Sequence, residues 1–289
     1  MDFTTVPNEW FKAAKVDLEL AEYSKNKKIY DNYVAFLQHA EEKLGKGILA
    51  IFSIIRSKKP NQSIESYFKE LSNGTLKTGT AIDFTHDWEE EFFKKVLNKE
   101  FLLYLGLPEY YLLIITNLKN YFDNLKRVDI SIRDVENALN ASRVVLGFVE
   151  KDDLLNSMYE ALIKPGANGL DKIVQKQELD KIVNSAVKKS EIAANKTKLP
   201  SNIRIIDRMK GSKLMIILGA LMPIHSLLIP HFKADFPSQE GIVYDESNPI
   251  VLRGSEIESI LKELPDHLEN IYNELVEIAK SDYYIKWVF

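Results

Sequence analysis

Four ionisable side chains in the first fifty residues recur at spacings of three and four. Because such steps return to one face of an α-helix, His39, Glu42, Lys43 and Lys46 would share one arc, here called the polar arc. An imidazole, a carboxylate and two ammonium groups on one arc could bind a nucleotide phosphate or meet the same arc of a second copy. A plainer arrangement also fits, in which Glu42 and Lys46 form a solvated ion pair and His39 lies at the edge of the core.

The other histidines give weaker signals. His86 and Asp87 stand at the expected start of a helix, where they could contribute to the same nucleotide site or interface, although the helix dipole alone accounts for an acid there. His225 and His231 flank Pro230 in an apolar stretch without the further ligands that a metal needs, so a core or pocket-lining position is expected. The chain has no cysteine and no P-loop, dinucleotide-binding, zinc-protease or nucleophile-elbow motif. We expect no metal and no cofactor.

Charge is distributed unevenly along the chain, although the net charge is only −4. Basic residues outnumber acidic ones by twelve to five over residues 163–213, whereas acidic residues outnumber basic ones by twelve to three over residues 235–282. A dense run of basic side chains can neutralise nucleic-acid phosphates, although few aromatic residues are interspersed for base stacking. The candidate nucleic-acid-binding residues are Lys188, Lys189, Lys196, Lys198, Arg204 and Arg208.

The elements that would position these residues are helices. Apolar residues at helical spacing predict helices over residues 10–21, 30–55, 63–71, 88–103, 109–125, 135–149, 154–163, 175–196, 203–229 and 255–279. In the second helix, Glu41 and the charged members of the polar arc are expected mostly off the apolar stripe. Ser131 and Asp134 predict a capping box, and Pro223 and Pro265 predict a kink or division. No strand alternation is present, so we expect an all-α fold.

The longest apolar segment, residues 214–229, predicts a buried core helix. It is interrupted by Pro223 and His225 and is shorter than the ~20 residues that a bilayer span requires. The first ten residues lack the basic start and apolar run of a signal peptide. We expect a cytoplasmic protein with no membrane partner.

The first two predicted helices resemble the HEPN family (higher eukaryotes and prokaryotes nucleotide-binding domain), whose members are small antiparallel helical bundles. The resemblance is carried by Trp10-x3-Ala14-x2-Asp17-Leu18-x2-Ala21 and by Phe36-x2-His39-Ala40-x-Glu42-Lys43-x2-Lys46. Thr85-His86-Asp87-Trp88 is similar to the start of the family's third helix, and residues 134–149 resemble its closing helix.

Two domain arrangements follow from the resemblance. The first places a HEPN-like bundle over residues 1–150 and an additional helical C-terminal region over residues 151–289. The second matches residues 231–237 and the last helix to the family's late segment, which gives one HEPN-like bundle with an insertion at about residues 105–210. The first is preferred because it keeps the connections short.

The resemblance also bears on function. Ribonucleases of the family carry an arginine followed five to seven positions later by a histidine, and no such pair occurs in this chain. The resemblance therefore implies a binding or assembly protein with no catalytic residues, associated with nucleotide or RNA, forming a homodimer and working beside a minimal nucleotidyltransferase, as in toxin–antitoxin systems. Two alternatives stay open: a HEPN-type ribonuclease with a non-standard active site, and a nucleic-acid-binding protein that uses the basic segment 163–213.

Overall fold

The structure is a computed structural model that describes residues 6–57, 88–96, 116, 119–120, 122–127, 129–147, 201–231 and 243–280. The named elements are α1 (Val6–Asn26), α2 (Tyr30–Ser57), α4 (Trp88–Glu91), the π-helical turn η1 (Phe92–Val96), α7 (Ile132–Leu146), α10 (Ser201–Leu228) and α11 (Pro249–Lys280). No strand occurs in these ranges, so the all-α expectation is confirmed for them. The helices predicted over residues 63–71, 154–163 and 175–196 lie outside the described residues.

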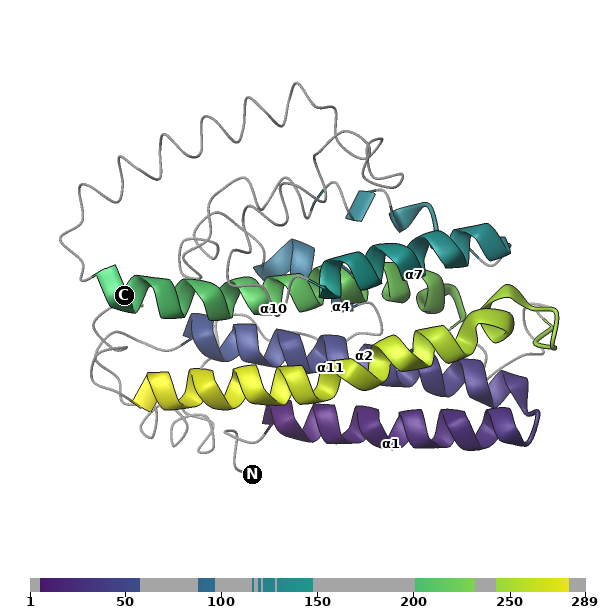
Figure 1. Cartoon of the computed structure of the whole chain (residues 1–289), viewed down its shortest axis with the longest axis horizontal. Helices are drawn as coiled ribbons and strands as arrows, with labels where there is room; N and C mark the ends of the chain where they lie inside the picture. The colour runs from purple at the N-terminus through teal and green to yellow at the C-terminus, as the bar shows by residue number, and fades with distance from the viewer. Residues whose placement is uncertain are drawn as a thin grey trace, which may run out of the picture.

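Helices α1 and α2 form an antiparallel hairpin, which Figure 1 shows along the lower side of the molecule. The turn between them ends α1 with Lys28 in the left-handed region at φ 58°. The Ile29 N–H donates to the Ser24 carbonyl at 2.9 Å and the Lys28 N–H to the Lys25 carbonyl at 2.9 Å, the pair of bonds that closes many helix C-termini. This turn reverses the chain and lets the two apolar faces meet.

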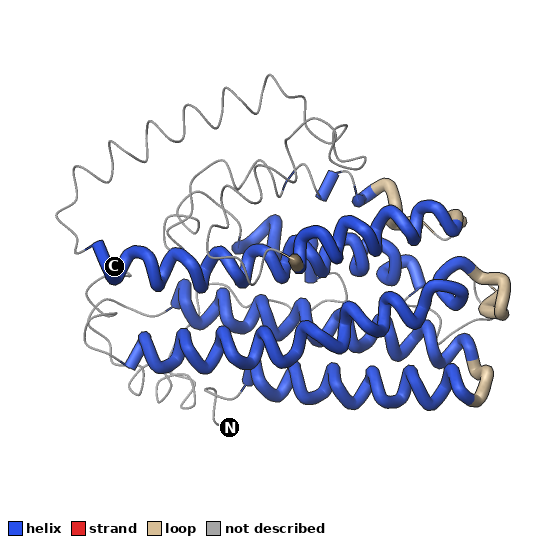
Figure 2. The backbone as a smooth tube through the Cα atoms, in the orientation of Figure 1, coloured by secondary structure: helices blue, strands red, loops and turns tan. Residues whose placement is uncertain are grey.

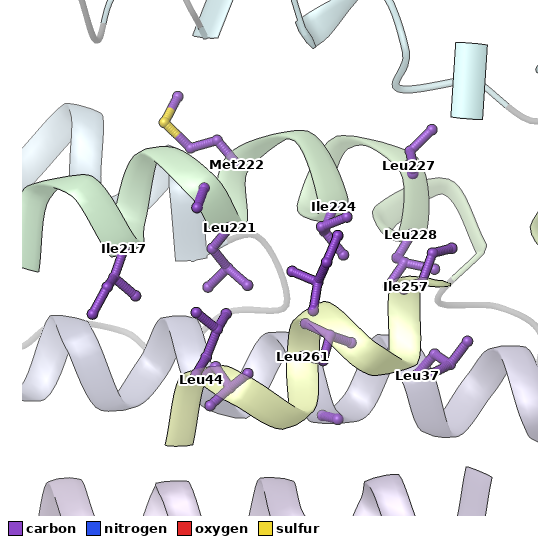
Figure 3. Packing of buried hydrophobic residues seen from close by; sticks show 14 of the residues in the cluster. Leu37, Leu44, Ile217, Leu221, Met222, Ile224, Leu227, Leu228, Ile257 and Leu261 are labelled. Atoms are coloured by element: carbon purple, nitrogen blue, oxygen red, sulfur yellow. The ribbon is translucent and has the colours of Figure 1, made fainter. Parts of the chain in front are cut away.

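The remaining long helices pack on this hairpin. Helix α11 contacts α1, α2 and α7, and α10 contacts α2, α7 and α11 (Figures 1 and 2). Figure 3 shows Leu44 of α2 on the side of Leu221 of α10, and Leu37 of α2 on the side of Ile257 of α11. Helix α2 therefore lies at the centre of the bundle and is covered on several sides at once.

The apolar segment of α10 is buried, as the sequence predicts. Residues 213–231 are long and apolar enough to cross a membrane by length and composition, but 89% of that segment is buried inside the protein. Every residue from 214 to 228 is buried. This burial fits the core helix of a soluble protein.

The two prolines inside helices do not divide them. Helix α10 continues through Pro223 and α11 through Pro265, which excludes the predicted division at either position. A proline removes one backbone hydrogen bond from a helix. Pro223 and Pro265 are both buried, so packing on neighbouring helices holds the flanking turns in place.

One hydrophobic cluster joins the two halves of the sequence. It contains Phe11 and Leu44 from the first half and Leu221, Leu261 and Tyr272 from the second. The cluster also contains Val135 and Leu139, which lie within the range of the alternative insertion, so it does not distinguish the two arrangements. The proposed boundary near residue 150 lies outside the described residues, so the division into domains stays a prediction.

The predicted capping box at the start of α7 is confirmed. The Asp134 N–H donates to Ser131 Oγ at 3.2 Å, and the Ser131 N–H donates to Asp134 Oδ2 at 2.9 Å. The hydrogen bonds that the Ser131 N–H and hydroxyl donate to the Asp134 carboxylate, with the Arg127 guanidinium beside them, hold the pKa of Asp134 below its ordinary value. The carboxylate therefore stabilises the fold above the unfolded pKa of about 3.9, and this contribution is lost as the pH falls through the lower folded value.

Replacing Ser131 by alanine is expected to lower the free energy of unfolding by about 1 kcal/mol, because the first turn of α7 loses its side-chain acceptor. Urea unfolding at neutral pH measures the change. Asn137→Ala is the matched control: Asn137 is exposed in the interior of the same helix, where alanine is the better helix former. Equal losses in the two variants would contradict a capping role for Ser131.

Candidate functional site

The first candidate site, the polar arc, forms interactions inside the bundle. Glu42 and Lys46 are buried and form an ion pair with each other. Gln38 Nε2 donates to Glu42 Oε2 at 3.0 Å, and Lys46 Nζ lies 5.5 Å from the centroid of the Trp10 ring. The alternative of a solvated Glu42–Lys46 pair is therefore only half right: the two side chains do form an ion pair, but the pair is largely removed from water.

The other two members of the polar arc lie nearer the surface. Lys43 Nζ lies 2.5 Å from Oδ2 of the buried Asp17 on α1, so this contact joins the two helices of the hairpin. His39 is half-buried, and its ring meets Phe36 edge-on with the centroids 6.3 Å apart. All four members thus contact side chains of α1 or α2. Nucleotide binding by the polar arc stays a prediction.

The remaining candidates fall largely outside the described residues. His86 and Asp87 immediately precede α4 and are not described, and neither are Lys188, Lys189, Lys196 and Lys198. Arg204 and Arg208 lie in the first three turns of α10, where the helix is described but its side chains are not. The roles proposed for these residues therefore stay predictions.

A buried polar group that the sequence did not single out lies at the centre of the bundle. It consists of Glu41 on α2, Trp88 on α4 and His225 on α10, here called the Glu41 cluster, and all three side chains are fully buried. Trp88 Nε1 donates to Glu41 Oε1 at 2.6 Å, and His225 Nδ1 lies 3.0 Å from Glu41 Oε2. The Trp88 and His225 rings pack with their centroids 4.9 Å apart. The carboxyl group of Glu41 thus joins three helices.

The Glu41 carboxyl is strongly affected by its surroundings. Burial raises the pKa of Glu41, while the charge and hydrogen bond of His225 and the N–H of Trp88 oppose that rise. The ring nitrogen of His225 that faces the Glu41 carboxyl is Nδ1, and the tautomer and charge of the ring decide whether that nitrogen donates or accepts the hydrogen bond.

A buried ion pair lies next to the Glu41 cluster, beside Trp88. Glu89, also fully buried, lies with Oε2 2.5 Å from Nζ of Lys126. Lys126 also contacts Asp123 at 3.3 Å, and that residue is closer to the surface. The pair offsets the cost of burying the Glu89 charge, which is large for an isolated carboxylate.

The sequence does contain a signal for Glu41. It stands four residues after Leu37 and three before Leu44, which places it within the apolar stripe of α2, so the expectation that it lies off the stripe is wrong. An acid at such a position must be buried or must distort the packing. Its partner His225 is 184 residues away, and no local pattern connects the two. The core position expected for His225 and His231 is confirmed, because both are buried.

The Glu41 cluster contains the chemical groups of a proton-transfer pair, but a substrate cannot reach them. A carboxyl and an imidazole in contact can exchange a proton. Neither side chain reaches solvent, so a substrate arriving from water would not touch them. Among the described residues, no group of three or more histidine, aspartate or glutamate side chains could hold a metal ion. The geometry is that of a structural group that fixes how α2, α4 and α10 pack.

The fold and these contacts define an all-helical bundle protein whose core contains two buried polar groups, the Glu41 cluster and the Glu89–Lys126 ion pair. Comparisons of the chain with protein-family models, with curated proteins and with solved structures each give no match.

Proposed function

We propose that this chain is a non-catalytic, HEPN-like binding or assembly protein. The observation that carries the proposal is the engagement of its candidate chemical groups: Glu42 with Lys46, Lys43 with Asp17, and Glu41 with His225. A buried group that is already paired gains little by meeting a phosphate, because it must first break that pair. The engagement of these side chains therefore supports a role in packing and not in catalysis.

The resemblance to the HEPN family suggests the setting of this function. The proposed protein is cytoplasmic, forms a homodimer and associates with a nucleotide or RNA, with a minimal nucleotidyltransferase as its second partner. A role in a toxin–antitoxin system belongs to the same proposal. The antiparallel packing of α1 and α2 agrees with it, since the family's bundles begin with such a hairpin.

Purified full-length protein is expected to leave RNA intact. Single-stranded and hairpin RNAs, incubated with the chain and separated on a denaturing gel, should show no more cleavage than without protein, and His39→Ala and His86→Ala should match the wild type. Cleavage that either substitution abolishes would replace the proposal by the alternative of a ribonuclease with a non-standard active site.

A second candidate function, nucleic-acid binding, is favoured by the charge of residues 163–213. Fluorescence anisotropy on the same RNAs separates it from the first. If the basic segment binds phosphates, affinity should fall by about 10³ or more between ~50 and ~200 mM salt, as for a protein that contacts six or more phosphates. Binding that is absent or insensitive to salt removes this candidate.

A further inference from the structure

Helix α1 carries a second apolar face, which no described part of the chain covers. Its inner face packs Phe11, Ala14, Leu18 and Ala21 into the core. On the opposite face Val16, Leu20 and Tyr23 are 53%, 39% and 60% exposed. Single exposed apolar residues are common on protein surfaces, whereas three on one line along a helix mark a contact surface.

The polar residues that continue this line are charged, with opposite signs at its two ends. The outer stripe consists of Glu9, Ala13, Val16, Leu20, Tyr23 and Lys27. Lys27 directly follows α1 and keeps the helical register, because its N–H donates to the Tyr23 carbonyl at 3.1 Å. Glu9 and Lys27 are both exposed. The apolar segment is thus bounded by an acid at one end and a base at the other.

The spacing of the outer stripe is that of a two-helix coiled coil. Its members follow one another at intervals of 4, 3, 4, 3 and 4 residues, which is the alternation of the two core positions of a heptad. The stripe is also symmetric about residue 18: the pairs Val16 and Leu20, Ala13 and Tyr23, and Glu9 and Lys27 are each equidistant from it. A two-fold axis through that point superposes the stripe on itself in the reverse direction.

We propose that the outer stripe binds the same stripe of a second copy of this chain, with the two α1 helices antiparallel about a two-fold axis near residue 18. Val16 then packs on Leu20 of the opposite helix, and the small Ala13 makes room for the large Tyr23. Glu9 meets Lys27 at both ends. A parallel pair would place Glu9 against Glu9 and lysine against lysine, so charge selects the antiparallel arrangement.

The expected dimer is weak. The stripe spans the 19 residues from Glu9 to Lys27, about 27 Å at the rise of an α-helix. One helix on one helix covers less than the roughly 800 Å² per partner of a standard stable interface. Glu9 also contacts Lys12 of its own chain at 3.1 Å, and Lys27 Nζ lies 5.8 Å from the Tyr23 ring centroid, so the end pairs form by exchange of partners. We therefore expect the dissociation constant of the dimer to lie in the micromolar range.

This inference deepens the assembly role proposed above and rests on it. It differs from the interface expected at the polar arc, because it places the contact on the outer face of α1. Mass measurements can refute it while the RNA assay leaves the non-catalytic proposal standing, and the reverse is equally possible.

The first test is sedimentation velocity of the full chain over a range on the order of 5–500 µM. The wild type should shift from monomer to dimer across that range, and Leu20→Glu should raise the dissociation constant by about tenfold or more. Ile132→Glu is the matched control: Ile132 is 38% exposed, nearly the value for Leu20, and lies on α7 away from the stripe. The control should dimerise as the wild type does, and circular dichroism should report equal helix content in all three proteins.

The second test changes only the charged ends of the outer stripe and leaves its apolar part intact. Glu9→Lys and Lys27→Glu each place like charges opposite one another at both ends and should each weaken association several-fold, more at low salt than at high salt. The double variant Glu9→Lys/Lys27→Glu restores opposite charges and should recover the wild-type constant. A wild type that stays monomeric overturns the proposal, as does a Leu20→Glu variant that dimerises normally. A double variant no better than the single ones overturns the antiparallel geometry.

Discussion

Replacing Glu41 by alanine is expected to lower the free energy of unfolding by about 3–5 kcal/mol, the loss typical of removing one member of a buried polar pair. The substitution takes away the acceptor of the Trp88 N–H and the carboxyl partner of His225, where water does not reach. It also leaves a cavity, which adds to the cost. Urea unfolding followed by circular dichroism measures the change.

Two further variants show which part of the Glu41 cluster matters. Glu41→Gln keeps the shape of the side chain, can accept from Trp88 and can donate to His225, so its loss should be smaller, about 1–2 kcal/mol. Glu263→Ala on α11 is the control, because Glu263 is exposed and its truncation should change stability by less than about 0.5 kcal/mol. If Glu41→Ala costs no more than Glu263→Ala, the cluster does not hold the helices together as described.

Replacing Gly45 by alanine is expected to destabilise the protein by about 1–3 kcal/mol, the usual cost of overpacking a core. A Cβ atom at this position would lie well inside van der Waals contact with three atoms of the Trp88 ring. That ring is fixed on its other sides by Glu41 and His225, so it has little freedom to move away. In an exposed helix the same substitution would gain about 1 kcal/mol from helix propensity.

Gly219→Ala is the control for this prediction, because its expected effect on stability has the opposite sign. It is also buried in a helix, but a Cβ there would meet only Val145, at 3.6 Å, which is an ordinary contact. Gly219→Ala should therefore be neutral or stabilising by up to about 1 kcal/mol. Thermal unfolding of the two variants side by side gives the comparison. Stabilisation by both substitutions would mean that α2 and α4 do not approach as closely as described.

The helices of this chain could be predicted because the signals that produce them are local. The apolar period of residues 10–21 and 30–55 predicted α1 and α2, and Ser131 with Asp134 predicted the start of α7. Each signal acts over a few residues, so neighbours in sequence suffice to read it. The prolines show the limit of local reasoning: Pro223 and Pro265 break isolated helices, but packing on neighbours carries α10 and α11 past them.

The candidate site could be predicted only in part. The polar arc was found from its spacing, but its burial was not, because the sequence does not say how many neighbours cover α2. Glu41 was placed on the wrong side of that helix for the same reason. The Glu41–His225 contact joins positions far apart in the sequence, and a single chain without a known partner position gives no sign of it.

By itself, the sequence determined which segments become helices, where several of them begin, and that one face of each is apolar. Only the tertiary structure decided which faces are covered. Helix α2 has neighbours on several sides, so its acids and lysine must pair in the core, whereas α1 has neighbours on one side, and its second apolar line stays in water. The reason is that helical periodicity arises within one chain segment, while burial depends on every segment that packs against it.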